Sequence, residues 1–321
     1  MYRQAPPFAV QIEATEGCNL RCTFCGLNGI RGPNVRSTDR YMLVDTAETI
    51  ARDIARAGWH ARIEFAMHGE PTLNPYLPYL ILAFRDALPH ASIMLTTNGV
   101  PLTKPAEDFS AKVEKLFAYG LNMLALDNYQ GLQVAPLMRA WGAAHRIPVY
   151  EYPAEGAGNP NRRHDYRTRS ISIVQDISVA TQGTHATLNN HAGAAAPLNS
   201  RGQGKRCAKP FREMSIRWDG HVALCCNDWR GVFKVGDVNG RTVESIWHDP
   251  AMYAARKHLL RGERTFAPCQ GCDALSYRPG LLPDQLGKET YPPADANDDE
   301  LIQLATAGQP YTLPVLRPWE K

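Results

Sequence analysis

The chain of 321 residues has a hydrophobic content of 44%, which suits one large folded domain with a smaller one attached. Its formal net charge of +3 is too small to require a polyanionic partner. The longest apolar run, over residues 77–84, falls well short of the roughly 20 residues that span a bilayer, so we expect no membrane protein. Residues 1–10 contain no apolar signal segment, and we therefore expect a cytoplasmic protein.

The first half of the chain alternates short β-rich runs with amphipathic stretches. Candidate strands cover residues 8–14, 62–67, 92–97, 123–126, 148–152 and 170–176. Apolar residues spaced three and four apart predict helices over residues 45–57, 76–88, 105–119 and 135–145. Repeated β-then-α units indicate a parallel sheet with its active site at the carboxyl ends of the strands. About six such units predict an α/β fold, a partial (β/α)6 TIM-like barrel.

The second half has a different organisation. Residues 178–206 are rich in Gly, Ala, Asn and Ser and are typical of a linker or loop. Asp219-Gly220 between two apolar runs predicts a β-hairpin, and residues 242–261 predict one helix. We therefore divide the chain into a core (1–177), a linker (178–206), a small domain (207–290) and a tail (291–321) that forms a surface wrap or is partly disordered.

The eight cysteines fall into two groups separated by a long interval. A chain of this length without a signal segment does not need disulfides, so metal or redox use is favoured. The first group is Cys18, Cys22 and Cys25, a CxxxCxxC motif directly after the first predicted strand. Three thiolates at this spacing can bind three irons of a cubane cluster and leave the fourth open. Zinc is the alternative, but zinc sites usually pair two CxxC units with a fourth ligand nearby, and the nearest histidine is His60.

This motif, with Phe24 before its last cysteine, resembles the hallmark of the radical S-adenosylmethionine (AdoMet) superfamily. His68-Gly69-Glu70-Pro71 resembles the Gly-Gly-Glu-Pro motif of that family, with His in the first position. The resemblance implies that the open iron is chelated by the methionine part of AdoMet, with Gly69 and Glu70 contacting its amino group.

Further cofactor contacts are implied at the ends of later strands. Thr96-Thr97-Asn98-Gly99 resembles the family segment that meets the ribose and the carboxylate, although Thr-Asn-Gly alone is also an ordinary turn. Asp127 and Glu151 end the fourth and fifth predicted strands and are expected to point toward the same mouth, although either could cap a turn. The cofactor-binding residues expected in this way are Phe24, Gly69, Glu70, Pro71, Thr97, Asn98, Asp127 and Glu151.

The second group contains four cysteines that can close around one metal centre: Cys207, Cys225, Cys269 and Cys272. The arrangement resembles the twitch domain, a shortened SPASM domain, and the stretch from Asn190 to Gly193 is similar to the Asn-Arg-Ala-Gly sequence found there. The two resemblances together imply two [4Fe-4S] clusters, while a structural zinc site remains the alternative for the second group. Cys226 adjoins Cys225 in the predicted hairpin, so its side chain should point the other way. It is either a small buried apolar residue or a hydrogen-atom donor to a substrate radical.

The family resemblance implies an enzyme that cleaves AdoMet reductively to a 5′-deoxyadenosyl radical, which abstracts a substrate hydrogen. An external electron donor of the flavodoxin or ferredoxin type is implied. Twitch-type relatives act on aminosugars, on ribosomal peptides or, in phage-encoded members, on amino-acid-modified thymine bases in DNA. Residues 24–29 and 64–70 resemble that phage-encoded group, which implies the host cytoplasm as the location.

We expect a redox-neutral isomerisation or epimerisation, with a two-electron dehydrogenation as the second choice. The non-enzymatic alternative is a structural metal protein that binds nucleic acid. Its contacts would come from basic and aromatic residues in two loops: Arg162, Arg163, His164, Tyr166, Arg167, Arg169, Arg201, Lys205 and Arg206.

Overall fold

A computed structural model describes residues 4–22, 24–30, 40–129, 133–152, 168–175, 190–195, 202, 204–274 and 296–307. The side chains of residues 28, 29 and 175 are not among those described. Within these ranges, no helix is both long and apolar enough to cross a membrane.

The described strands form one sheet of nine strands in the order β5-β6-β4-β3-β2-β1-β7-β8-β9. Neighbouring strands from β5 through β7 in this order are parallel, and β8 and β9 continue the sheet in antiparallel fashion. The predicted α/β fold with a parallel partial barrel is confirmed. The strands are β1 (Ala9–Ile12), β2 (Arg62–Phe65), β3 (Ile93–Thr97), β4 (Met123–Asn128), β5 (Val149–Tyr152), β6 (Ser170–Gln175), β7 (Glu213–Ile216), β8 (His221–Ala223) and β9 (Lys234–Asp237).

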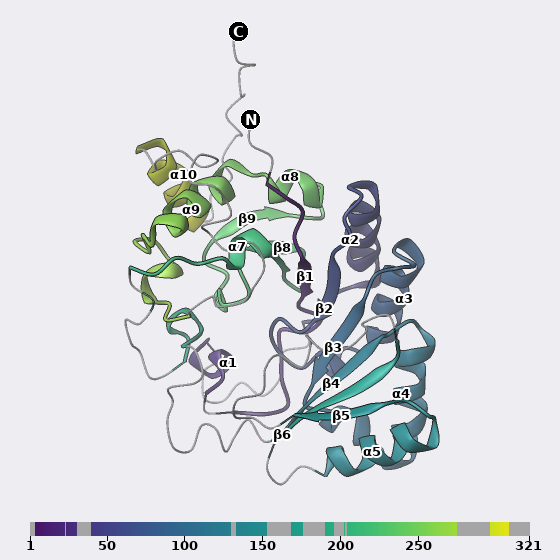
Figure 1. Ribbon diagram of the computed structural model, residues 1–321. Helices are drawn as coiled ribbons and strands as arrows, with labels where there is room; N and C mark the ends of the chain where they lie inside the picture. The colour runs from purple at the N-terminus through teal and green to yellow at the C-terminus, as the bar shows by residue number, and fades with distance from the viewer. Residues whose placement is uncertain are drawn as a thin grey trace.

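Four helices cover the outer face of the parallel strands, as Figure 1 shows. Val10 and Ile63 pack against these helices in the main core, so the intervening residues Gln11 and Glu64 lie on the opposite, inward face of the sheet. The inward face is therefore polar at β1 and β2, while the outer face is apolar. The helices are α2 (Val44–Arg56), α3 (Leu77–Ala87), α4 (Phe109–Ala118) and α5 (Val134–Ala144).

Strand β6 lies between β4 and β5, so the fifth strand in the chain occupies the edge of the sheet. Ile171 and Ile173 of β6 are fully buried, whereas Tyr150 of β5 is 38% exposed. The more apolar strand takes the inner place, where both of its edges are paired and its outer face is covered.

Among the described residues, the carboxy-terminal half adds four α-helices around β7–β9, and a short helix follows the first cysteine group (Figure 1). The single helix expected over residues 242–261 is in fact two helices. Pro250 lacks the N–H that would continue the first helix, and the Asp249 side chain accepts from Ala251 N to cap the second. The elements are α1 (Gly26–Ile30), α7 (Lys209–Arg212), α8 (Val243–Trp247), α9 (Pro250–Arg261) and α10 (Ala296–Ala307).

Helix α10 lies in the part of the chain expected to be a surface wrap or partly disordered. Ile302 and Ala305 are buried, and Lys257 Nζ of α9 lies 2.6 Å from Asp298 Oδ2. This stretch is therefore a packed helix, while the rest of the predicted tail lies outside the described residues. Because β7 pairs with β1, the sheet also crosses the predicted boundary at residue 207. The division into domains stays a prediction.

Candidate active site

The first cysteine group lies in the loop that follows β1. Burial raises the pKa of the Cys18 thiol to about 12 and that of Cys22 to about 11, and the negative charge of the neighbouring thiols adds to both shifts. Cys18 and Cys25 also pack against Leu27 of α1. Three half-buried thiols whose charges repel one another suit a cationic iron centre, because binding to iron neutralises the thiolates.

The segment Gly69-Glu70 is held directly against the loop that leads into this cysteine group. Glu70 N donates to Gly17 O at 2.8 Å. Gly69 has φ +68°, and a Cβ atom there would lie 2.1 Å from Thr15 O. Only glycine allows this close approach of two backbones. Pro71 is buried and begins a short 3-10 turn, Pro71–Leu73.

The Glu70 carboxylate is buried among hydrogen-bond donors from two strand ends. Its Oε1 accepts from Thr72 N at 3.0 Å and from the hydroxyl groups of Thr72 and Thr97, and its Oε2 accepts from Asn98 N at 2.8 Å. Burial raises the pKa of Glu70, while these hydrogen bonds oppose that shift. The residues expected after β2 and β3 therefore meet in one network.

Asn98 also links this network to the first cysteine group. Its Nδ2 donates to Asn19 Oδ1 at 3.0 Å, and it lies 3.8 Å from Cys18 Sγ. Asn19, inside the CxxxCxxC motif, was not singled out from the sequence. Its contact depends on the loops after β1 and β3 meeting at the carboxyl ends of the strands, which no local pattern reveals.

Phe24 and Asp127 lie close to Tyr129, which the sequence also did not reveal. The rings of Phe24 and Tyr129 are stacked with centroids 6.2 Å apart. A hydrogen bond from Tyr129 lowers the pKa of Cys22, against the larger effect of burial. Burial, followed by the charge of Glu70, raises the pKa of Asp127 to about 7. Tyr129 directly follows β4, and this position could have identified it from the sequence, because the carboxyl ends of parallel strands meet at the active site.

Glu151 does not lie at this mouth, so the expected orientation of its side chain is wrong. Its carboxylate binds Arg139 of α5, with Arg139 Nε 2.7 Å from Glu151 Oε1, and both side chains are largely exposed. The register pairs Glu151 with Ile173, which belongs to the outer, helix-covered core. Successive side chains of a strand alternate between faces, so Glu151 points to the helices and its neighbour Tyr150 points inward.

The four cysteines of the second group are all buried. Burial raises the pKa of Cys225 and of Cys269. The charges of Cys226 and Cys269 add to the shift of Cys225, and those of Cys207 and Cys272 add to the shift of Cys269. Burial also raises the pKa of Cys207. Four buried thiols close to one another suit a closed cluster with no open position.

Asn190 joins the linker to the last two of these cysteines. Its Nδ2 donates to Gly271 O at 2.8 Å, and Asp273 N donates to its Oδ1 at 3.2 Å. Arg264 Nη1 donates to Cys272 O at 3.1 Å. The turn Cys269–Gly271 is thus held by side chains on both sides.

Among the described residues, no three His, Cys, Asp or Glu side chains are placed to hold a single metal ion.

Cys226 has polar neighbours. Lys209 Nζ lies 3.1 Å from Cys226 Sγ, and Glu213 Oε2 lies 3.2 Å from Lys209 Nζ. Gln11 Nε2 donates to the same Glu213 oxygen at 3.2 Å. Cys225 and Cys226 both follow β8 rather than lying within it, and burial and then the charge of Cys226 raise the pKa of Cys225. The expectation that their side chains point to opposite faces stays a prediction.

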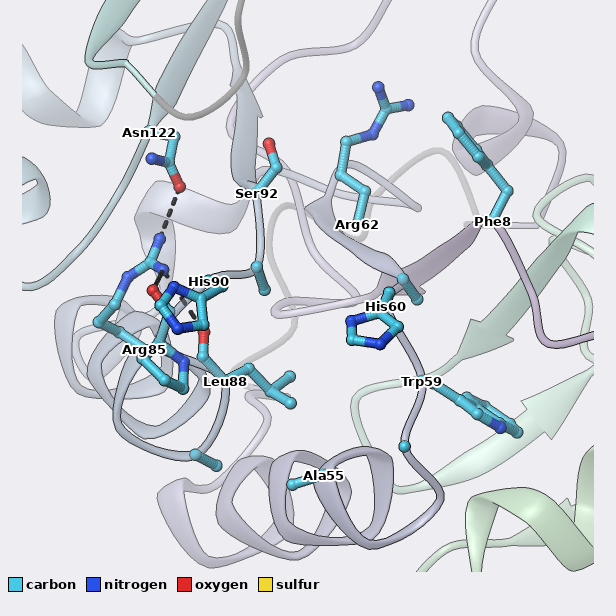
Figure 2. A pocket seen from close by; sticks show the side chains of 15 residues that line it. Phe8, Ala55, Trp59, His60, Arg62, Arg85, Leu88, His90, Ser92 and Asn122 are labelled. Atoms are coloured by element: carbon cyan, nitrogen blue, oxygen red, sulfur yellow. Dashed lines mark hydrogen bonds between the residues drawn. The ribbon is translucent and has the colours of Figure 1, made fainter.

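A large hollow lies at the amino ends of the strands (Figure 2). The first cysteine group and the Glu70 network lie at the opposite, carboxyl ends. Its volume is about 1100 Å³. Arg85 in its wall donates to Gly120 O and to Asn122 Oδ1, and Arg62 binds Glu64. These cations have structural partners, and no cysteine lines the hollow. Of the two basic loops, only Arg169, Lys205 and Arg206 fall within the described residues.

Residues 12–129, which contain the first cysteine group and the Glu70 network, match the family model for the radical SAM superfamily. The chain therefore contains a radical SAM domain. Residues 207–273 of this radical SAM enzyme match the model of an iron-sulfur cluster-binding domain, named SPASM. Both families predicted from the cysteine spacing are confirmed. A radical SAM domain implies AdoMet, a [4Fe-4S] cluster and an electron donor.

Two curated enzymes are similar in sequence. An S-adenosyl-L-methionine-dependent 2-deoxy-scyllo-inosamine dehydrogenase from Niallia circulans is 21% identical over 269 residues, 83% of this chain and 93% of that enzyme. A GTP 3′,8-cyclase from Chlorobaculum tepidum is 33% identical over 95 residues, 30% of this chain but only 27% of the cyclase. The crystal structure of BtrN in complex with AdoMet and 2-DOIA has the same fold, with a TM-score of 0.61, 17% identity and coverage of 87% of this chain and 98% of that one.

Proposed function

We propose that this radical SAM enzyme oxidises a small, polar, hydroxylated substrate by two electrons, on the inward face of the sheet between the two cysteine groups. This reverses the order of the two reaction classes expected from the sequence. The prediction of an epimerase or isomerase stays the second candidate.

The first cluster would be held by Cys18, Cys22 and Cys25, and the second by Cys207, Cys225, Cys269 and Cys272. AdoMet would lie against Gly69-Glu70 and the end of β3, where the charge of Glu70 favours its amino group. Phe24, Pro71, Thr97, Asn98 and Asp127 surround the same region. When bound, these groups supply a 5′-deoxyadenosyl radical and a one-electron acceptor.

The observation that carries the proposal is the polar inward face. Gln11, Glu64 and Glu213 place carboxylate and amide groups there. Ser172 and Ser215 are fully buried, and their hydroxyl groups have no hydrogen-bond partner within the described residues. A face that carries carboxylate, amide and hydroxyl groups suits a ligand with hydroxyl or amino groups rather than an apolar one.

The sequence comparison supports the same reaction class. The relative that covers most of both chains is named a dehydrogenase of an aminocyclitol, 2-deoxy-scyllo-inosamine. Oxidation of a secondary alcohol to a ketone breaks one C–H and one O–H bond. The hydrogen atom would leave the carbon, the hydroxyl proton would pass to a protein base or to water, and the second cluster, when bound, would supply the acceptor for the remaining electron. The chain's own part is to orient that carbon and exclude water.

A specific contact favours the epimerase as the second candidate. The Cys226 thiol is half-buried and lies beside Lys209 and Glu213, two polar side chains at the inward face. A thiol in such a place could return a hydrogen atom to a substrate radical. Peptide and DNA substrates stay predictions, as does a cytoplasmic location.

The test uses anaerobically reconstituted enzyme with AdoMet, a low-potential reductant and a panel of aminocyclitols and aminosugars. We expect 5′-deoxyadenosine to form only with a substrate and in equal amount to a product that is lighter by two hydrogen atoms, measured by mass spectrometry. A product of unchanged mass that gains deuterium from deuterated water would establish the epimerase instead. Absence of 5′-deoxyadenosine with every member of the panel would reject this substrate class.

A further inference from the structure

His68 stands in the first position of the cofactor segment, where the family motif has glycine. Its imidazole is buried, with 5% of the residue exposed, and both ring nitrogens have partners. Nδ1 lies 3.0 Å from Glu13 Oε1, and Nε2 lies 2.8 Å from the carbonyl oxygen of Cys226. One side chain therefore contacts two segments that are 55 and 158 residues away in the chain.

These two segments lead to the two cysteine groups. Glu13 follows β1 and precedes the loop of the first group, and its second oxygen accepts from Trp218 N at 3.2 Å and faces Arg217 Nε at 3.4 Å. Cys226 directly follows Cys225 of the second group. His68 thus fixes the carbonyl of the turn that carries Cys225, from a position next to Gly69.

Trp229 makes a second connection between His68 and the first cysteine group. Its ring stacks on His68 with centroids 4.2 Å apart, and it packs in one cluster with Leu27 and Ala194, against Cys18 and Cys25. A Cβ atom on Gly26 would lie 2.7 Å from Trp229 Cδ2, so the indole rests on the backbone next to Cys25. The space between the two cysteine groups is filled at this point and leaves little room for independent movement.

We propose that His68 is a positioning residue that couples AdoMet binding at Gly69-Glu70 to the second iron-sulfur centre, through the carbonyl of Cys226. This inference rests on the proposed cofactor sites. Gly69 and Glu70 pack tightly against Thr15 and Gly17, so this segment and the adjoining His68 respond to cofactor binding as one unit. Coupling between two sites is reciprocal, so the redox state of the second centre must then change the affinity for AdoMet.

The test compares two substitutions that each keep half of the imidazole. The amide nitrogen of Gln lies near the place of Nε2, so His68→Gln keeps the donor to the Cys226 carbonyl and loses the contact with Glu13. The amide nitrogen of Asn lies near the place of Nδ1, so His68→Asn does the reverse. The probe is the electron paramagnetic resonance spectrum of the reduced second centre in the full-length, iron-loaded enzyme, recorded with and without AdoMet.

We expect AdoMet to shift the spectrum of the second centre in the wild type and in His68→Gln, and the shift to be lost in His68→Asn. We also expect AdoMet affinity to change roughly fivefold or more between the two redox states of that centre in the wild type, the lower end of usual allosteric coupling, and to be insensitive in His68→Asn. Iron content is measured for every sample. Should His68→Asn fail to load iron at the second site, the response of His68→Gln decides alone.

A wild-type enzyme that makes 5′-deoxyadenosine but shows no AdoMet-dependent shift overturns the coupling and leaves the proposed function standing. An equal response in fully loaded His68→Asn, or a lost response in His68→Gln, also overturns it. A wild type that neither loads two clusters nor cleaves AdoMet contradicts the proposed function itself.

Discussion

The ammonium group of Lys209 lies 3.1 Å from the sulfur of Cys226. The same ammonium binds Glu213, whose carboxylate also accepts from Gln11 of β1. An apolar packing role for Cys226 would surround its sulfur with hydrocarbon, whereas its observed neighbours are charged. The contact holds the thiol in one orientation beside the inward face, so Cys226 is the residue whose replacement best separates the two reaction classes.

Cys226→Ser tests the choice between oxidation and epimerisation. In the proposed oxidation no hydrogen returns to the substrate, so the variant should still release a product lighter by two hydrogen atoms, measured by mass spectrometry. If Cys226 donates a hydrogen atom, the variant should form 5′-deoxyadenosine without the normal product, and the wild type in deuterated water should give product with one added deuterium. Full activity in the variant with unlabelled wild-type product of unchanged mass would point to an isomerase that recycles its original hydrogen.

Replacing Cys18, Cys22 and Cys25 together by Ala tests the two iron sites. The wild type reconstituted without oxygen should bind about eight irons, four in each cubane, and the triple variant about four with no 5′-deoxyadenosine formed. Iron assay and chromatography measure the two quantities. Cofactor cleavage by the triple variant would contradict the assignment, and zinc recovered in place of the remaining four irons would make the second site structural.

Glu70→Gln should weaken AdoMet binding about tenfold or more and leave the iron content intact. The amide removes the negative charge near the cofactor's amino group and turns one donor toward Thr97 or Asn98, which are donors themselves. Equilibrium binding to the reduced enzyme measures the effect. Glu151→Gln is the matched control: its carboxylate binds Arg139 on the outer face, so AdoMet affinity should not change. Equal losses in both variants would contradict this placement.

Gly69→Ala and Gly58→Ala separate backbone strain from close packing. Both glycines have a left-handed backbone, with φ +68° and +66°, so each substitution carries a strain of about 1–2 kcal/mol. A Cβ atom at Gly58 meets nothing within 4 Å, whereas at Gly69 it would collide with Thr15 O. Denaturant unfolding should show only the strain for Gly58→Ala, and a larger loss together with lost AdoMet binding for Gly69→Ala. An equal loss of unfolding free energy in both variants would mean that the loop around Thr15 moves aside at little cost.

Asp127 should make stability depend on pH. Burial and then the charge of Glu70 raise its pKa to about 7, above the value of about 3.9 for an unfolded chain. Between these values the folded protein keeps a proton that the unfolded chain has released, so the free energy of unfolding falls as the pH rises through this window. Asp127→Asn lacks this effect and should gain stability relative to wild type from roughly pH 5 to pH 8. Urea denaturation at both values measures the difference, and a constant difference would contradict the shift.

Local patterns in the sequence determined much of this protein. The period of apolar residues located the six parallel strands and four outer helices of the first half within a few residues. The resemblance of the CxxxCxxC motif to a family hallmark indicated the radical SAM domain that the family model matches. The break between α8 and α9 was missed, although Asp249-Pro250, a cap followed by a residue that cannot continue a helix, was a signal for it.

Contacts between segments distant in the chain were decided only by the tertiary structure. Glu151 and Asp127 both lie near strand ends, but Glu151 points toward α5 and Asp127 lies near Glu70. The sequence pattern alone did not determine which face of the sheet each side chain occupies. The order of β5 and β6 depended on which strand loses less by standing at the edge. His68 of the first half meets Cys226 of the second because β7 pairs with β1 across some 200 residues of chain. No local propensity encodes such a pairing, since its free energy comes from burial and hydrogen bonds that exist only once the sheet has formed.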